Sequence, residues 1–112
     1  MDVTEETRGG VLVLRVNEPR LDAARAPGLR DELIRRVEAG NTTLVLDLSQ
    51  VEFMDSSGLG ALVSCLKRLG ARGSLSVVGA KGAVARLFAL TRMDKVFPLH
   101  DDLEAAVAGA GG

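Results

Sequence analysis

Short apolar runs alternate with longer segments of helical periodicity along this sequence, and no other feature constrains its fold as strongly. The short runs are rich in β-branched residues and predict strands: Val11–Val16, Leu44–Leu48 and Leu75–Val78. The longer segments carry apolar residues every three to four positions: Leu29–Val37, Leu59–Leu69 and Val84–Thr91. Strands that alternate with helices form βαβ units with right-handed crossovers. The pattern therefore predicts an α/β domain, a mixed sheet of about four to five strands with a parallel centre packed against about four helices.

The N-terminal and central strands complete this plan. Residues Val3–Thr7 are predicted to form a first strand that pairs with Val11–Val16 across the turn signal Gly9-Gly10. A further short strand is expected near Val96–Leu99. We place Leu44–Leu48 at the centre of the sheet, because its mostly apolar run lacks the strict alternation of a half-exposed strand.

The C-terminal region is predicted to hold one last short helix. Asp101 and Glu104 have the spacing of a capping box at its start, with Asp in place of the usual Ser or Thr. The glycine- and alanine-rich sequence that follows this helix should fray. We therefore expect a single domain over residues 1–107 and a flexible tail over residues 108–112.

Charge and composition argue against several classes of function. Fourteen basic and fifteen acidic residues give a net charge of -1, whereas nucleic-acid-binding domains normally carry a basic excess on one face. Three phenylalanines are the only aromatic residues, which leaves no platform for stacking bases. No apolar stretch approaches the roughly 20 residues that cross a bilayer, and the acidic N-terminus lacks the pattern of a signal peptide. We expect a cytoplasmic protein that contacts neither nucleic acid nor membrane.

The single cysteine and the single histidine are expected to be structural. Cys65 falls on an apolar helical stripe, which predicts a buried small hydrophobe and not a reactive thiol. One cysteine forms no internal disulfide and no zinc cluster of cysteines. His100 precedes Asp101 and Asp102, a trio that could be drawn as a metal site but is more often a solvated turn at a helix start. No metal and no cofactor are predicted.

The segment Asp55-Ser56-Ser57-Gly58 leaves a strand and opens a helix, and it is the candidate site. Asp and Ser are preferred at helix N-caps, so one of them needs no functional explanation. Three nevertheless occur in succession, and Gly58 and Gly60 each cost about 1 kcal/mol within a helix. The C-terminal end of a parallel strand at a helix N-terminus is also where α/β proteins place binding sites. A serine hydrolase is not indicated, because Met54 stands where a nucleophile elbow needs glycine.

These residues carry a resemblance to a known family. Leu46-Asp47-Leu48-Ser49, followed by Phe53-Met54-Asp55-Ser56-Ser57-Gly58-Leu59-Gly60, resembles the signature of STAS domains, specifically of bacterial anti-sigma-factor antagonists. The segment Leu21–Ala26 is similar to their sequence before the first long helix, and Ala83–Phe97 is similar to their third helix and last strand. The resemblance covers nearly the whole chain, from about Val3 to Val107, and implies the STAS fold.

The resemblance implies a binding protein controlled by phosphorylation, not an enzyme. In such partner-switching pathways the unphosphorylated antagonist captures an anti-sigma factor, a serine kinase with a histidine-kinase-like ATPase fold, and so frees the sigma factor. The kinase phosphorylates the first serine after the aspartate, here Ser56, and a serine phosphatase reverses the modification. We expect the protein itself to be a monomer or a weak dimer. The residues expected to contact the partner are Asp22, Asp55, Ser56, Ser57, Gly58 and Leu59.

A phosphate on Ser56 is predicted to change affinity without changing the fold. It would add about -1.5 to -2 charge at a helix N-terminus, where free N–H groups and the helix dipole favour anions. On the partner-binding surface, the same dianion beside Asp55 opposes docking through desolvation and like-charge repulsion.

Two departures from the family pattern, covering three positions, lie beside this surface. Pro19-Arg20 stand where the family commonly has Gly-Glu, and Arg25 replaces a threonine with a long cation. Both departures bear on which partner the protein binds, and both arginines could meet an acidic partner. A solvated face of the first long helix is predicted for three further arginines: Arg30, Arg35 and Arg36.

Other roles of the same fold stay open on the sequence. One is a STAS subunit of a lipid-transport ABC system, bound permanently to its ATPase. Another is a stressosome-type scaffold, which assembles into large particles, and a third is a sensor of a small ligand at the same helix N-terminus. Reversible phosphorylation, particle size and calorimetry separate these roles from the antagonist.

Overall fold

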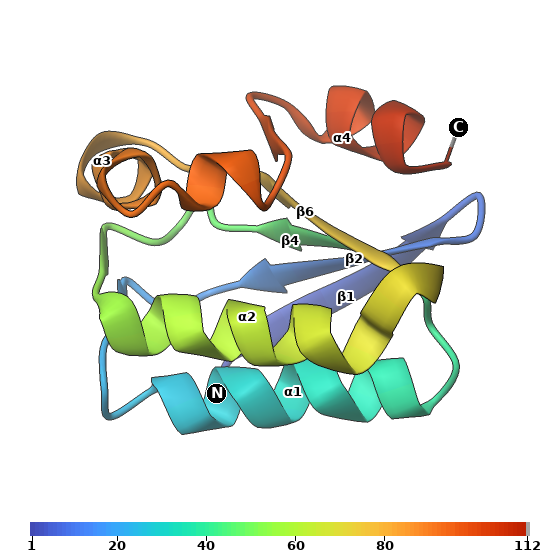
Figure 1. The fold of residues 1–112 in the computed structure, drawn as a ribbon, viewed down its shortest axis with the longest axis horizontal. Coiled ribbons are helices and arrows are strands. Elements are labelled where there is room, and N and C mark those ends of the chain that lie inside the picture. The colour runs from blue at the N-terminus through green and yellow to red at the C-terminus, as the bar shows by residue number, and fades with distance from the viewer. Residues whose placement is uncertain (112) are drawn as a thin grey trace.

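A five-stranded mixed sheet forms the centre of the molecule (Figure 1). In the computed structural model, which describes residues 1–111, its strands are β1 (Val3–Arg8), β2 (Val11–Val16), β4 (Thr43–Asp47), β6 (Ser74–Val78) and β7 (Leu99–His100). They lie in the order β1-β2-β4-β6-β7, with β1 antiparallel to β2 and every other neighbouring pair parallel. The predicted parallel centre, with β4 in the middle, is confirmed.

Helices cover both faces of this sheet. α1 (Ala26–Glu38) and α2 (Ser56–Leu69) lie side by side on one face, and α4 (Leu103–Gly111) covers the other (Figure 1). α3 (Gly82–Leu90) follows β6 and contacts the short strand β5 (Phe53–Met54). Single 3-10 turns at Gly70–Arg72 and Met93–Lys95 follow α2 and α3. Among residues 1–111, no helix is both long and apolar enough to span a membrane.

The central strands send apolar side chains to both faces, which explains their nearly continuous apolar runs. Leu14, Leu46 and Val77 belong to the larger core, which they form together with α1 and α2. Val13 and Val45 belong to a smaller core beneath α4. Full burial of a leucine or valine contributes about 1.5–3 kcal/mol, so these alternating residues hold the helices on both faces.

The last strand begins later than its sequence predicts. β7 starts at Leu99, whereas the apolar run suggested a start near Val96. Phe97 is instead fully buried, and its ring packs edge-on against Phe88 of α3 with the centroids 6.3 Å apart. Pairing with β6 begins only at Pro98, whose carbonyl accepts an amide of β6 at 2.9 Å. The burial of Phe97 therefore determines where the chain enters the sheet.

α4 also differs from its predicted bounds. Its cap is Asp102, whose Oδ1 accepts an amide of the first turn at 2.8 Å, and not Asp101. A cap must directly precede the first helical residue, and Asp102 does so. Residues 108–111 continue the helix where the sequence predicts a tail, and Ala110 packs against the smaller core. Gly112 lies outside the described residues, and the flexibility of this end stays a prediction.

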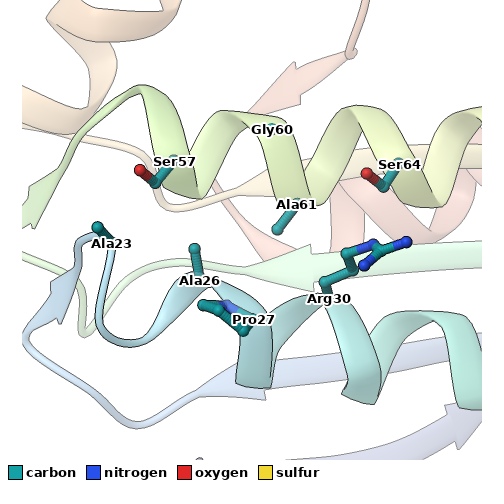
Figure 2. A pocket seen from close by; sticks show the side chains of 8 residues that line it. All are labelled: Ala23, Ala26, Pro27, Arg30, Ser57, Gly60, Ala61 and Ser64. Atoms are coloured by element: carbon teal, nitrogen blue, oxygen red, sulfur yellow. The ribbon is translucent and has the colours of Figure 1, made fainter.

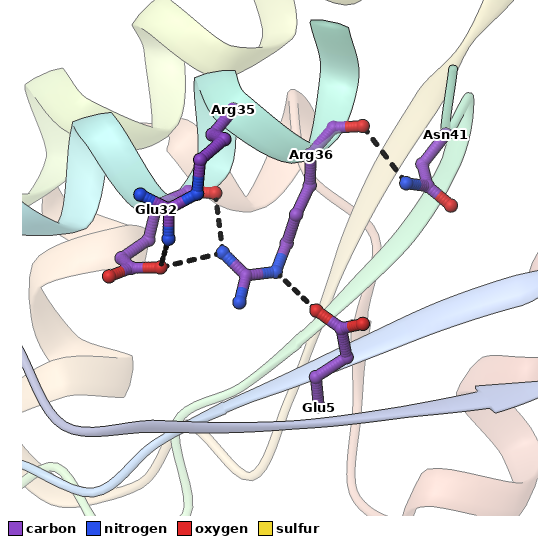
Figure 3. Close-up of polar contacts among 5 residues, drawn as sticks. All are labelled: Glu5, Glu32, Arg35, Arg36 and Asn41. Carbon is purple, nitrogen blue, oxygen red and sulfur yellow. Dashed lines mark hydrogen bonds and ion pairs between the residues drawn. The ribbon is translucent and has the colours of Figure 1, made fainter. Parts of the chain in front are cut away.

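Arg36 connects α1 to the edge strand β1 and does not belong to the solvated face predicted for it (Figure 3). Its Nε donates to Glu5 Oε1 and its Nη1 to Glu32 Oε1, each at 2.7 Å. The Arg36 side chain is 15% exposed, whereas that of Arg35, which also pairs with Glu32, is 65% exposed. The Asn41 amide donates to the Arg36 carbonyl at 2.9 Å beyond the end of the helix.

Candidate functional site

A second, two-stranded sheet positions the candidate site. β3 (Arg20–Leu21) pairs in parallel with β5, with Arg20 opposite Phe53 and Leu21 opposite Met54. Neither strand is predicted from the sequence, because two residues show no periodicity. This pairing brings the turn before α1 next to the start of α2.

Asp55 is the residue of the predicted capping segment that serves as the N-cap of α2. Its Oδ1 accepts the amide of Ser57 at 2.9 Å and that of Gly58 at 3.4 Å, while its own amide donates to the Leu21 carbonyl at 3.3 Å. One carboxylate thus occupies two of the N–H groups that a helix leaves unpaired at its start. The first turn of α2 therefore offers fewer free amides to an added phosphate than the sequence suggested.

Gly58 and Leu59, both predicted as partner contacts, are buried. A Cβ on Gly58 would lie 2.8 Å from the Leu21 carbonyl oxygen and 2.8 Å from Met54 Cγ, so only glycine permits this close approach. Leu59 is 5% exposed and belongs to the larger core. Neither residue presents a side chain to a docking partner in this conformation. A Cβ on Gly60, by contrast, would meet no atom within 4 Å, so no close approach explains that glycine.

Ser56 is the exposed residue of the segment. It is the first residue of α2, and its hydroxyl makes no hydrogen bond to any group of residues 1–111. Ser57 is half-buried and faces a different surface. The segment therefore presents one hydroxyl outward from a cap whose other members are held by internal contacts.

A groove of about 420 Å³ between α1 and α2 adjoins Ser57. Figure 2 shows Ala26 and Ala61 facing one another across it, with Arg30 extending toward Ser64 on the side away from Ser57. The groove is not obvious from the sequence, since it needs both helices. One signal could have found it, a stripe of small residues on one face of α2: Ser57, Gly60, Ala61 and Ser64.

Asp22 lies where the chain turns from β3 into α1, and its carboxylate is already engaged. Its Oδ2 lies 3.5 Å from Arg20 Nε, and its Oδ1 lies 3.6 Å from Arg25 Nη1 and accepts the Arg25 amide at 3.3 Å. Partial desolvation works against ionisation, but the hydrogen bond from Arg20 and the contacts with Arg25 outweigh it and lower the pKa of Asp22. Arg25 Nε also lies 3.3 Å from Glu18. Both arginines thus contact acidic residues of their own chain.

Cys65 and His100 occupy structural positions. Cys65 is fully buried in α2, as predicted, and burial raises the pKa of its thiol to about 11. The ring of His100, in β7, lies against Gly109 of α4. Within the part of the chain that the structure describes, no group of three or more His, Cys, Asp or Glu side chains is placed to hold a metal ion.

The fold and this capped helix start define a STAS domain. The chain matches the STAS domain family over residues 2–106 and belongs to that family. The anti-sigma-F factor antagonist RsfB of Mycobacterium tuberculosis is 36% identical over 111 residues, which cover 98% of this chain and 89% of RsfB. An anti-sigma F factor antagonist of Paenibacillus polymyxa is 30% identical over 106 residues, which cover 91% of this chain and 88% of that protein.

Solved structures agree with this assignment. The crystal structure of an anti-sigma factor antagonist from Mycobacterium paratuberculosis superimposes with a TM-score of 0.91 at 33% identity. The match covers 99% of this chain and 94% of that one. The family and fold that the sequence motif predicts are thereby confirmed.

Proposed function

We propose that this protein is an anti-sigma-factor antagonist of a bacterial partner-switching pathway. In its unphosphorylated form it binds an anti-sigma factor that is also a serine kinase with a histidine-kinase-like ATPase fold. Phosphorylation of Ser56 releases it, and a serine phosphatase restores the binding form. The protein acts as a regulated partner and kinase substrate, not as an enzyme, and this role places it in the cytoplasm with the sigma factor. The names of relatives at 36% and 30% identity support this role.

The observation that carries the proposal is that, within the first turn of α2, Ser56 is exposed while the residues around it make internal contacts. Asp55 caps α2, Gly58 packs against β3 and Leu59 fills the core. Ser56 alone is exposed, and none of these internal contacts depends on its hydroxyl. A kinase can therefore modify Ser56 without displacing a structural contact, which supports a role for this hydroxyl as the phosphoacceptor.

The docking surface of this proposal surrounds Ser56. Asp22 and Asp55 lie beside it on the paired ends of β3 and β5, and Ser57 leads into the groove between α1 and α2. A partner that covers Ser56 desolvates this surface on binding. A phosphate there adds a dianion next to two carboxylates, which opposes rebinding by repulsion and by the cost of desolvating the charge.

The test is intact-mass analysis after incubation with ATP and the anti-sigma kinase of the same organism. We expect one added phosphate, which disappears in Ser56→Ala and persists in the matched control Ser57→Ala. Calorimetry should then show that the phosphorylated form binds the kinase at least about tenfold more weakly. Phosphorylation that survives Ser56→Ala, or equal affinity of the two forms, would contradict the proposal.

The same samples separate the other roles of this fold. A tight complex with a transporter ATPase and no phosphate on Ser56 would indicate a permanent subunit. Elution as a large particle would indicate a scaffold, whereas the antagonist should elute as a monomer or a weak dimer. A small molecule that binds at the start of α2 in calorimetry would indicate a ligand sensor.

A further inference from the structure

Two arginines share the carboxylate of Asp22 beside the start of α2. Arg25 holds Asp22 through its amide at 3.3 Å and its guanidinium at 3.6 Å, whereas Arg20 reaches it through one contact of 3.5 Å. The Arg20 side chain is 53% exposed, and exposed ion pairs of this kind are weak. If Arg20 moves away, Asp22 keeps Arg25. The guanidinium of Arg20 is therefore free to exchange partners without leaving a carboxylate unpaired.

The pairing of β3 with β5 brings Arg20 to the segment that leads into Ser56. Its guanidinium carbon lies 4.3 Å from the centroid of the Phe53 ring, the residue opposite it in the β3–β5 pair. The stacked side chain already extends along β3 to Asp22, the residue after the strand. The Asp55 amide binds the Leu21 carbonyl there, so Ser56 begins α2 beside the same strand end.

The neighbouring arginines make other contacts, although Arg25 also contacts Asp22. Arg25 lines a cleft together with Met1, Glu18 and Gly28, whereas the groove beside α2 is lined by other residues of the turn. Arg30 does line that groove, but it extends toward Ser64, two helical turns beyond Ser57 (Figure 2). Arg20 is the arginine whose own strand is hydrogen-bonded to the segment that leads into Ser56.

A phosphate on Ser56 needs a countercharge that the helix start supplies only in part. The Asp55 carboxylate already accepts the amides of Ser57 and Gly58, so these two donors are occupied. Asp22 and Asp55 add negative charge on the same side. A guanidinium binds a phosphate dianion with parallel, charge-assisted hydrogen bonds, which are stronger than a single contact of 3.5 Å to a carboxylate.

We propose that Arg20 is a phosphate-binding residue, which leaves Asp22 and binds the phosphomonoester dianion of phosphorylated Ser56. The inference rests on the proposed function, because that function assigns the phosphate to Ser56. Phosphorylation then changes two parts of the docking surface together. It turns Ser56 into a bound dianion, and it leaves Asp22 paired with Arg25 alone.

The test is a ³¹P NMR titration of the protein with phosphoserine incorporated at position 56 during synthesis, so that no kinase is needed. The second pKa of a phosphoserine is about 6. In the protein with Arg20 present, we expect the second pKa of phosphoserine 56 to lie below this value, because a neighbouring cation favours the dianion. In Arg20→Gln this pKa should rise by roughly half a unit. The matched controls are Arg25→Gln, which removes the other arginine on Asp22, and Arg72→Gln, which removes an exposed arginine beyond the far end of α2. Arg72→Gln should leave the value unchanged, whereas Arg25→Gln, which makes Asp22 compete for Arg20, should raise it less than Arg20→Gln does.

A second readout needs no substitution at Arg20. The Nε–H resonance of Arg20 should shift with the same midpoint as the phosphate resonance. An unmoved Arg20 resonance, or an equal rise of the phosphate pKa in all three variants, would overturn the assignment. Failure of the proposed function is distinguishable, since it appears in the kinase assay as an absence of phosphate on Ser56 and leaves this titration unaffected.

Discussion

The carbonyl oxygen of Leu21 lies 2.8 Å from the position that a Cβ on Gly58 would occupy. This approach presses the first turn of α2 onto the end of β3, and through it onto the turn that carries Asp22. Two segments more than thirty residues apart in the sequence thus share one surface around Ser56. The glycine in the motif is explained by this contact, since any other side chain would have to move the helix or the strand.

The two glycines of α2 should respond in opposite directions to alanine. Gly58→Ala is expected to destabilise the protein by about 1–3 kcal/mol, because the added methyl overlaps backbone as well as side chain. Gly60→Ala is expected to stabilise it by up to about 1 kcal/mol, because the methyl meets open space and alanine favours the helix. Urea unfolding of the two variants measures both changes. A similar loss in both would show that Gly58 is not specially constrained.

Removal of the Asp55 carboxylate should weaken the start of α2. Asp55→Ala leaves the amides of Ser57 and Gly58 without their acceptor, and the loss of an N-cap costs about 0.5–2 kcal/mol. Asp55→Asn is the matched control, because an amide oxygen can still accept both bonds and asparagine is an equally good cap. Thermal and urea unfolding should give Asp55→Asn a stability close to that of the unchanged protein. Equal destabilisation by both substitutions would refute the capping role.

Acidification should weaken the connection between α1 and β1. The pKa of Glu32 is lowered, chiefly by the hydrogen bond from Arg36. Desolvation opposes this effect, but it is smaller, and the charge of Arg35 lowers the pKa further. A carboxylate with a lowered folded pKa stabilises the protein above its unfolded pKa of 4.5, and this contribution disappears as the pH falls through the lower folded value. Stability should therefore fall below pH 4.5. The loss between about pH 5 and about pH 3 should be smaller in Glu32→Gln.

The control for this pH dependence is Glu104→Gln, which changes an exposed carboxylate of α4 that pairs with no cation among the described residues. It should retain the full acid sensitivity. The pKa values of Glu18 and Asp22 are also lowered, so Glu32→Gln should reduce the acid-induced loss and not abolish it. Identical pH profiles for Glu32→Gln and the unchanged protein would contradict this account.

Much of the fold could be predicted from the sequence because its signals are local. Val11–Val16 coincides with β2, since periodicity reflects which face of an element is buried. Two helical stripes lie within α1 and α2, and the third runs one residue beyond α3, to its C-cap Thr91. A cap within Asp55–Ser57 was predictable because capping preferences are also local, although the sequence did not single out Asp55. The two-residue strands β3 and β5 are too short to show any periodicity. The start of β7 depends on the burial of Phe97 against Phe88 of α3, a tertiary contact that no local sequence pattern predicts.

The sequence predicted which residue types form the site, but not how these residues are arranged around it. The motif located Ser56 at the start of a helix, but it also suggested Leu59 as a contact, which the structure places in the core. The stacking of Arg20 on Phe53 depends on how β3 meets β5, and the buried position of Arg36 depends on the approach of β1 to α1. Such relationships arise only when segments distant in sequence come together.

The Cys65 thiol should react only when α2 opens. It is 0% exposed, and burial raises its pKa from 9.0 to about 11, so at pH 8 it is both inaccessible and protonated. Because the folded pKa is the higher one, burial of the neutral thiol favours folding below pH 9.0, and this contribution is lost as the pH rises toward about 11.

The matched control is Ser56→Cys in a Cys65→Ala background, which places the only thiol at the exposed start of the same helix. Alkylation of Cys65 should be at least about a hundredfold slower than that of the control and should match it in urea, because only unfolding exposes it. Equal rates without urea would mean that α2 opens readily, and Ser56 would then not stand on a rigid frame.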